Sequence, residues 1–313
     1  MPIVNSGDCV GNGKFKIMQK RVPHAASGAE PGELVAANIG EGSYGCVLLG
    51  EEVATGRPCA LKIFKAHTAG VNAQLEVQIL QKLQSELPIA DQAFFARLLD
   101  FSLLGKPFPF LALEFGGPSL WQALRSGPVT PRPIGLQLQA ALRAMHKKGI
   151  VHLDLKPANI LWTEEAKQLK VVDFGMAELI PKLGEEPAWK ARFEIYTSGS
   201  YRAPEIWCCS EDELRKHLLR PEVDIWAYGC VLYECETSSI LMQGTRSCKR
   251  VIEEWCRSWN LLRGGKASLH GKTSEADQLV VRFQKCRKTW RDKVLQCLSP
   301  DPNARRWPNL IGA

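Results

Sequence analysis

The hydrophobic and polar positions of the first third of the chain alternate in short segments that are separated by turn residues. Alternation with a period of two is typical of strands in an antiparallel sheet. The predicted strands cover residues 34–39, 46–53, 59–64, 97–103 and 108–113. One stretch between them differs, because four apolar residues recur at helical spacing and predict a helix over about residues 72–85. These residues are Leu75, Ile79, Leu80 and Leu83.

After Gly116-Gly117-Pro118 the apolar spacing becomes helical. The first residues with this spacing are Leu136, Leu138, Ala141, Leu142 and Met145. A strand-rich first third followed by a helix-rich remainder predicts an α+β protein with two lobes. The length of 313 residues supports two lobes, because it exceeds the size at which one core usually suffices. Ligands favour the crevice between such lobes.

Residues 1–33 are rich in Gly, Ala, Ser and Pro without lasting periodicity, so we expect a flexible N-terminal extension. The composition, 45% hydrophobic and 23% charged, is that of a globular protein. No apolar run approaches the roughly 20 residues of a membrane-spanning helix, and the first residues lack a signal sequence. The 11 cysteines are scattered and odd in number, which is typical of a reducing compartment. We expect an intracellular protein, cytoplasmic or nuclear, that is not secreted.

The net charge of +7 is unevenly distributed. Residues 246–293 contain 13 Lys and Arg against 5 Asp and Glu, an excess larger than that of the whole chain. A solvated helical face explains this excess, and so does a surface that attracts an acidic partner or acidic substrate segments. We do not expect a nucleic-acid partner.

Residues 152–159 read His-Leu-Asp-Leu-Lys-Pro-Ala-Asn and contain the most distinctive pattern in the chain. Asp154, Lys156 and Asn159 place a carboxylate, an ammonium and an amide on one tight loop. Asp173-Phe174-Gly175 follows after a short hairpin. Transfer of a phosphoryl group needs a carboxylate to orient the attacking hydroxyl, a cation for developing charge and oxygen ligands for magnesium. These residues resemble the catalytic loop and the magnesium-binding turn of protein kinases.

Gly40, Gly42 and Gly45 form a G-x-G-x-x-G pattern between two predicted strands. A plain hairpin also explains such a pattern, because glycine-rich turns are common. The strand that follows argues against a dinucleotide fingerprint, which opens a helix. The pattern is similar to the glycine-rich loop of protein kinases, which covers ATP.

Lys62 ends Cys59-Ala60-Leu61-Lys62, which is similar to the Val-Ala-Ile-Lys strand of protein kinases. Its expected partner is Glu76 on the predicted helix, because the apolar phase leaves Glu76 facing the strand. Glu86 is the alternative partner. A Lys–Glu pair would orient the ammonium onto the ATP phosphates.

The resemblance implies a serine/threonine protein kinase that uses ATP and two magnesium ions to phosphorylate Ser or Thr of a protein substrate. It covers about residues 34–310, with an N-lobe at 34–113, a hinge at 114–118 and a C-lobe at 119–313. It implies catalytic roles for Asp154, Lys156, Lys62 and Glu76, and metal ligation by Asn159 and Asp173. It implies ATP contacts by Ile39, Gly40, Glu41, Gly42, Ser43, Tyr44, Gly45, Cys46, Val47, Ala60, Lys62, Leu113, Glu114 and Gly116.

Two downstream motifs extend the resemblance. Residues 198–205, Ser-Gly-Ser-Tyr-Arg-Ala-Pro-Glu, resemble the end of an activation segment, and Arg305 is expected to pair with Glu205. Asp224 is expected to start the central helix of the larger lobe and to cap the backbone of the catalytic loop. Leu153 departs from the family, which usually has Arg before the catalytic Asp. We therefore do not expect control by phosphorylation of the activation segment.

Two other functions fit the same motifs. A kinase-fold binding module without turnover, a pseudokinase, usually loses residues of the Lys62, Asp154 or Asp173 type, and all three occur here. A small-molecule phosphotransferase shares the catalytic loop but generally lacks the substrate-binding segment at residues 198–205. Phosphate transfer to protein and metabolite pools distinguishes these alternatives.

Overall fold

The computed structural model describes residues 7–21, 34–42, 45–65, 71–104, 108–181, 199–208, 220–243, 248–264 and 275–311. The chain divides into two compact units. The first contains Met1–Leu87 and Ala96–Gly116, and the second contains Pro88–Phe95 and Gly117–Ala313. Among the described residues, no helix has both the length and the apolar character needed to cross a membrane.

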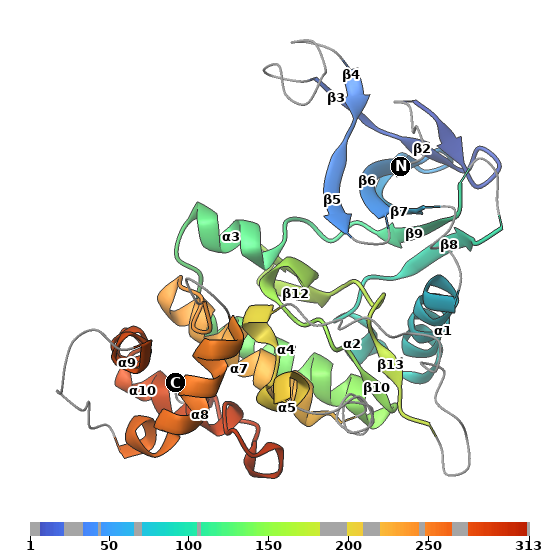
Figure 1. The fold of residues 1–313 in the computed structure, drawn as a ribbon. Helices are drawn as coiled ribbons and strands as arrows, with labels where there is room; N and C mark the ends of the chain where they lie inside the picture. Colours follow the sequence, from blue (N-terminus) through green and yellow to red (C-terminus); the bar gives the residue numbers. More distant parts are fainter. Residues whose placement is uncertain are drawn as a thin grey trace. The chain divides into compact units, whose positions relative to one another are not determined.

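The first unit is built on an antiparallel sheet with the order β1-β2-β6-β7-β9-β8, and β5 also pairs with β6 (Figure 1). The strands are β1 (Cys9–Val10), β2 (Phe15–Ile17), β5 (Asn38–Gly42), β6 (Gly45–Glu52), β7 (Arg57–Phe64), β8 (Leu98–Ser102) and β9 (Phe110–Glu114). A single long helix, α1 (Val71–Glu86), occurs among the described residues of this unit. Its apolar side is buried through Leu75, Ile79, Leu80 and Leu83. The predicted meander and helix are therefore confirmed, except that the predicted strand 34–39 is divided between β4 (Leu34–Ala36), which belongs to a separate two-stranded sheet, and β5.

The expectation of a flexible extension over residues 1–33 is wrong for residues 7–21. β1 and β2 belong to the sheet, and β3 (Gln19–Arg21) pairs with β4 (Leu34–Ala36). Val10, Phe15 and Ile17 are almost completely buried in the core of the unit. The alternation of Phe15, Lys16 and Ile17 is that of a strand, but it lasts only three residues and was too short to predict one.

The second unit is mostly helical, as predicted. Its helices are α2 (Ile89–Gln92), α3 (Leu120–Ser126), α4 (Pro131–Lys147), α5 (Pro204–Cys208), α7 (Glu222–Thr237), α8 (Cys248–Gly264), α9 (Glu275–Gln284) and α10 (Lys288–Cys297). Most residues of α7 are buried, so this helix forms the centre of the unit. Trp226 of α7 packs edge-on against Trp255 of α8, with 6.4 Å between ring centroids.

Two short antiparallel strand pairs position the catalytic-loop residues in this unit. β10 (Ile150–Val151) pairs with β13 (Glu178–Leu179), and β11 (Ile160–Thr163) pairs with β12 (Gln168–Val171). A single turn of 3-10 helix, Pro157–Asn159, links the loop to β11. Residues 152–159 are therefore held between two strands that each have an antiparallel partner.

Candidate active site

The polar residues of the catalytic-loop motif come together in the second unit. Lys156 Nζ donates to Asp154 Oδ2 over 2.7 Å. The side-chain amide nitrogen of Asn159, Nδ2, donates to the backbone carbonyl of Asp154 over 2.8 Å and to Asp154 Oδ2 over 3.0 Å. Asp154 and Asn159 are both buried. The predicted juxtaposition of carboxylate, ammonium and amide is therefore present.

Asp224, in the first turn of α7, holds the start of this loop. Its carboxylate accepts the backbone amides of His152 at 2.8 Å and Leu153 at 3.0 Å, as predicted. Leu153 has a φ of 66°, a left-handed conformation that is costly for a leucine. The two hydrogen bonds fix this strained backbone one residue before Asp154.

The same carboxylate receives a third hydrogen bond, from His146 Nε2 at 2.8 Å. Burial of Asp224 opposes its ionisation and raises its pKa, but the hydrogen bond from His146, the electrostatic attraction of the two imidazoles and the hydrogen bond from the His152 backbone amide outweigh burial. The pKa of Asp224 consequently lies below its usual value. Asp224 is therefore the ionised acceptor for both loop amides.

His152 connects the catalytic loop to the strand before Asp173. Its Nδ1 accepts the backbone amide of Asp154 at 3.3 Å, and its Nε2 lies 3.1 Å from the carbonyl of Val172. This network assigns the proton to Nε2, because Nδ1 must accept and Nε2 must donate. The His152 ring also packs 5.3 Å from the ring of Phe174. One side chain thus positions both Asp154 and the Asp-Phe-Gly turn.

Asn159 and Asp173 lie across one hairpin, because the Val172 amide donates to the Asn159 carbonyl over 3.0 Å. The side-chain nitrogen of Asn159 donates to Asp154, so the side-chain oxygen of Asn159 is the atom left to bind a cation. One amide oxygen and one carboxylate suit Mg²⁺, which is usually bound by few protein oxygens and completed by phosphates and water. Among the described residues, no group of three or more His, Cys, Asp or Glu forms a metal cluster of its own. These two residues therefore fit phosphate-bound magnesium.

In the first unit, Lys62 of β7 and Glu76 of α1 form a buried ion pair. Lys62 Nζ lies 2.8 Å and 2.7 Å from the two carboxylate oxygens of Glu76. Glu76 is 1% exposed and Lys62 8% exposed. The alternative partner, Glu86, is exposed and pairs with Lys82 one turn earlier on the same helix. The apolar phase of the helix therefore selected the correct glutamate.

The glycine-rich pattern joins β5 to β6. Gly42 is paired with Gly45, and the two residues between them, Ser43 and Tyr44, lie outside the described residues. A side chain at Gly45 would overlap the backbone carbonyl of Ile63 on β7, which explains why this position requires glycine. At Gly45 the absence of Cβ thus serves strand packing, a reason that the sequence pattern did not reveal.

The other residues predicted to contact ATP lie on β5, β6, β7 and β9 or just after β9. Ile39 is exposed, Val47 and Ala60 are half-buried, and Cys46 and Leu113 are buried. The Glu114 amide donates to the Arg97 carbonyl over 2.8 Å, so this amide belongs to the sheet. An adenine contact of Glu114 would therefore use its carbonyl.

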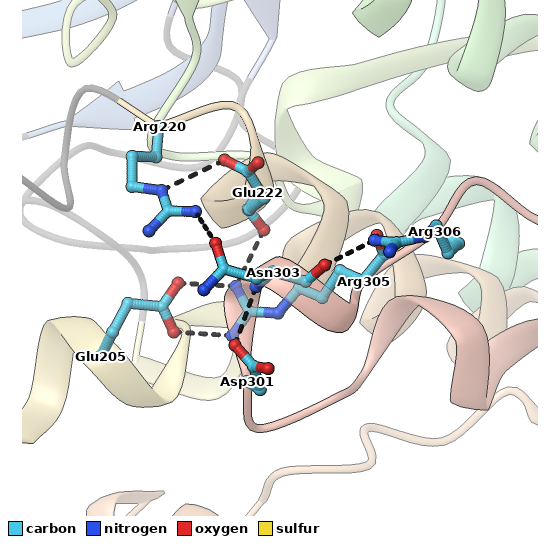
Figure 2. A network of polar contacts seen from close by, with 7 residues as sticks. All are labelled: Glu205, Arg220, Glu222, Asp301, Asn303, Arg305 and Arg306. Carbon is cyan, nitrogen blue, oxygen red and sulfur yellow. Dashed lines mark hydrogen bonds and ion pairs between the residues drawn. The ribbon is translucent and has the colours of Figure 1, made fainter.

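Residues 199–205, which resemble the end of an activation segment, are attached to the core of the second unit through Tyr201 and Glu205. Arg305 binds both carboxylate oxygens of Glu205 at 2.6 Å, as predicted, and donates to the carbonyl of Glu222 (Figure 2). It also donates to the carbonyl of Ser299 over 2.9 Å. Tyr201 Oη donates to Glu234 of α7 over 2.6 Å. Ser198 and the residues from Phe193 to Thr197 lie outside the described residues. The end of the segment is thus held at Tyr201 and at Glu205.

Sequence reasoning missed His146, Tyr201 and Glu234 as positioning residues. Each acts through a partner far along the chain: 78 residues separate His146 from Asp224, and 33 separate Tyr201 from Glu234. The buried face of α7, which includes Glu234 among apolar residues, was the available signal, because a buried carboxylate needs a partner.

The fold and this arrangement of loop, turn and ion pair define a protein kinase domain. The sequence profile of the protein kinase domain matches residues 34–309, and the chain belongs to the protein kinase family.

The relatives include mitogen-activated protein kinase 15 of Mus musculus, which is 30% identical over 221 residues, 68% of this chain and 38% of that protein. Cyclin-dependent kinase B2-1 of Arabidopsis thaliana is 30% identical over 230 residues, 68% of each chain. Cyclin-dependent kinase 20 of Rattus norvegicus is 30% identical over 231 residues, 71% of this chain and 60% of that protein. The chain thus spans between 38% and 68% of these three relatives.

Proposed function

We propose that this chain is an active serine/threonine protein kinase that transfers the γ-phosphate of ATP to a hydroxyl of a protein substrate. The observation that carries this proposal is the geometry around Asp154, where Lys156 and Asn159 both bond its carboxylate and Asp224 fixes the preceding backbone. A carboxylate beside a cation is what the attacking hydroxyl and the transferred phosphoryl group require.

In the proposed reaction, Asp154 orients the Ser or Thr hydroxyl and accepts its proton. The hydroxyl oxygen forms a bond to the γ-phosphorus while the bond from that phosphorus to the bridging β–γ oxygen breaks, and ADP leaves. Lys156 stabilises the charge on the transferred group. Its ion pair with Asp154 supports this role, because it would bring the ammonium close to the hydroxyl that Asp154 orients.

ATP is the proposed second substrate, and Lys62 is the proposed contact for its phosphates. Glu76 orients the Lys62 ammonium, since both carboxylate oxygens bond it. Asn159 and Asp173 would hold magnesium, which when bound neutralises charge on the phosphates. The glycine-rich turn would cover the phosphates, and residues of β5, β6, β7 and β9, with Gly116 after β9, would contact the adenine.

We further propose that activity does not require phosphorylation of the activation segment. Leu153 provides no cation for a phosphate at the position where the family usually has Arg. The end of the segment has instead two built-in anchors, the Glu205–Arg305 pair and the Tyr201–Glu234 hydrogen bond. Phosphatase treatment of the purified protein is expected to leave its activity unchanged.

The test compares the wild type with Asp154→Asn, using labelled ATP, magnesium and separate pools of protein substrates and metabolites. Label on Ser or Thr of protein, lost in the variant, supports the proposal. Label in a metabolite would support a small-molecule phosphotransferase instead. A wild type that binds ATP with magnesium but transfers no more label than Asp154→Asn would be a binding module. Asp292→Asn, at an exposed position of α10, is the matched control and is expected to retain full activity.

A further inference from the structure

The edge of the sheet beside β6 is formed by two separate strands of the chain. β2 pairs with one end of β6, where Phe15 lies opposite Glu52 and Ile17 opposite Gly50. β5 pairs with the other end, where Asn38 lies opposite Leu48 and Gly42 opposite Gly45. Both pairings are antiparallel, so β2 and β5 run in the same direction along β6.

The two strands meet opposite Leu49. The Met18 amide donates to the Leu49 carbonyl over 2.9 Å, and the Leu49 amide donates to the Ala37 carbonyl over 2.8 Å. In an unbroken antiparallel strand, one residue supplies both of these groups to its partner. Here Met18 supplies the N–H and Ala37 supplies the C=O. The two residues are themselves bonded, because the Ala37 amide donates to the Met18 carbonyl over 2.9 Å.

Gln19–Arg21 and Leu34–Ala36 leave this strand as an antiparallel pair, β3 and β4. Gln19 pairs with Ala36 and Arg21 with Leu34, which continues the pairing that begins at Met18 and Ala37. Figure 1 shows β3 and β4 extending away from the sheet that contains β2, β5 and β6. The β3–β4 pair therefore interrupts one strand after Met18, and the strand resumes at Ala37.

We infer that β2 and β5 are two halves of a single strand, and that residues 7–18 position the glycine-rich turn. The second half contains Gly40 and Gly42 and leads directly into the turn that the proposed function places over the ATP phosphates. The first half is held by the core of the same unit. The inference rests on the proposed function only for its effect on ATP.

The contacts of the first half show why it acts as a fixed anchor. Phe15 is completely buried and packs edge-on against Phe110 of β9, with ring centroids 6.2 Å apart. Ile17 is also completely buried, and Lys14 pairs with Asp100 of β8 over 2.7 Å. Residues 7–18 thus pair with β6 and also contact β9 and β8, at the opposite edge of the sheet. They precede residue 34, where the match to the protein kinase domain begins, so the folded unit of this chain starts earlier.

Three variants of the full chain test this inference. In the first, deletion of residues 19–37 joins Met18 to Asn38, which leaves Met18 opposite Leu49 and Asn38 opposite Leu48 in unchanged register. The second, Phe15→Ser, removes the main anchor of the first half. The third, Phe101→Ser, changes a phenylalanine on β8 that is 39% exposed and serves as the matched control.

Hydrogen–deuterium exchange of the amides of residues 38–48 is the first readout, because it does not depend on catalysis. We expect Phe15→Ser to accelerate this exchange by about tenfold or more, and the deletion and the control to change it by less than about threefold. The Michaelis constant for ATP should rise by about fivefold or more in Phe15→Ser alone.

The inference that β2 and β5 form one strand would be overturned if residues 38–48 exchanged as slowly in Phe15→Ser as in the wild type. It would also be overturned if they exchanged as fast in the deletion variant as in Phe15→Ser. Accelerated exchange with an unchanged Michaelis constant would overturn the positioning of the turn. A wild type without phosphate transfer would contradict the proposed function, while the exchange results would still decide whether the strand is in two halves.

Discussion

His146 Nε2 lies 2.8 Å from Asp224 Oδ2, the same oxygen that accepts the His152 backbone amide. His146 lies in the last turn of α4 and Asp224 in the first turn of α7, so one contact connects two helices of the second unit to the catalytic loop. The His146 side chain is 9% exposed and that of Asp224 is 1% exposed. The imidazole therefore orients the carboxylate that holds the strained backbone before Asp154.

The first prediction is that His146→Ala weakens both folding and catalysis. Loss of one hydrogen bond to a buried carboxylate should lower the free energy of unfolding by about 1–3 kcal/mol. The turnover number should fall more than the Michaelis constant for ATP changes, because the affected group is the catalytic loop. Urea denaturation and steady-state kinetics measure the two effects. Lys147→Ala, at the exposed neighbouring position, should have neither, and an equal loss in both variants would contradict the role of His146.

The parts of the fold that could be predicted from the sequence have local signals. The strands 45–52 and 57–64 were predicted over residues 46–53 and 59–64, and the helix 71–86 over about residues 72–85, because each pattern lies within a single segment. Glu76 was identified from the apolar phase of its own helix. The single strand formed by β2 and β5 could not be predicted. Its first half shows only three alternating residues, and its second half begins after the intervening β3–β4 pair. The Tyr201–Glu234 bond depends on packing between distant segments, which periodicity does not encode.

The second prediction compares two glutamates on α1. Glu76→Gln removes the charge that compensates the buried Lys62 ammonium, so we expect a loss of about 1–3 kcal/mol in the free energy of unfolding and a large fall in phosphate transfer. Glu86→Gln removes an exposed pair with Lys82 and should cost at most about 0.5 kcal/mol without an effect on activity. Denaturation and label transfer are the measurements. Similar behaviour of the two variants would show that the buried pair has no special role.

The third prediction concerns Arg305, whose side chain is fully buried against Glu205. Arg305→Ala leaves the Glu205 carboxylate and two backbone carbonyls without their donor, which should cost about 3–5 kcal/mol in the free energy of unfolding. Arg305→Lys should restore only a small part, because one ammonium cannot reproduce the bidentate contact. By contrast, Arg220→Ala removes a partly exposed ion pair with Glu222. It should lower the free energy of unfolding by about 1 kcal/mol or less.

A double variant of Glu205→Ala and Arg305→Ala provides the decisive comparison for this pair. Because it leaves no buried charge behind, it should be less destabilised than the sum of the two single variants, as measured by urea denaturation. Additive losses would mean that the two side chains stabilise the segment independently.

The fourth prediction concerns the pH dependence of stability. Burial raises the pKa of Glu234 above its usual value, against the opposing effect of the hydrogen bond from Tyr201. The folded protein therefore binds a proton more tightly at Glu234 than the unfolded chain does. The contribution of this group to stability is greatest below its unfolded pKa and falls as the pH rises through its folded pKa. Tyr201→Phe removes the opposing hydrogen bond and should enlarge this fall.

Thermal unfolding across a pH series tests this sign with Glu234→Gln. The glutamine keeps an oxygen for the Tyr201 hydroxyl but does not ionise, so the variant should gain stability relative to the wild type as the pH rises from acidic to neutral. Glu165→Gln, at an exposed position, should follow the wild type throughout. If Glu234→Gln instead lost stability relative to the wild type as the pH rose, the Glu234 carboxylate would be stabilised by folding. Burial would then not be the dominant influence on its ionisation.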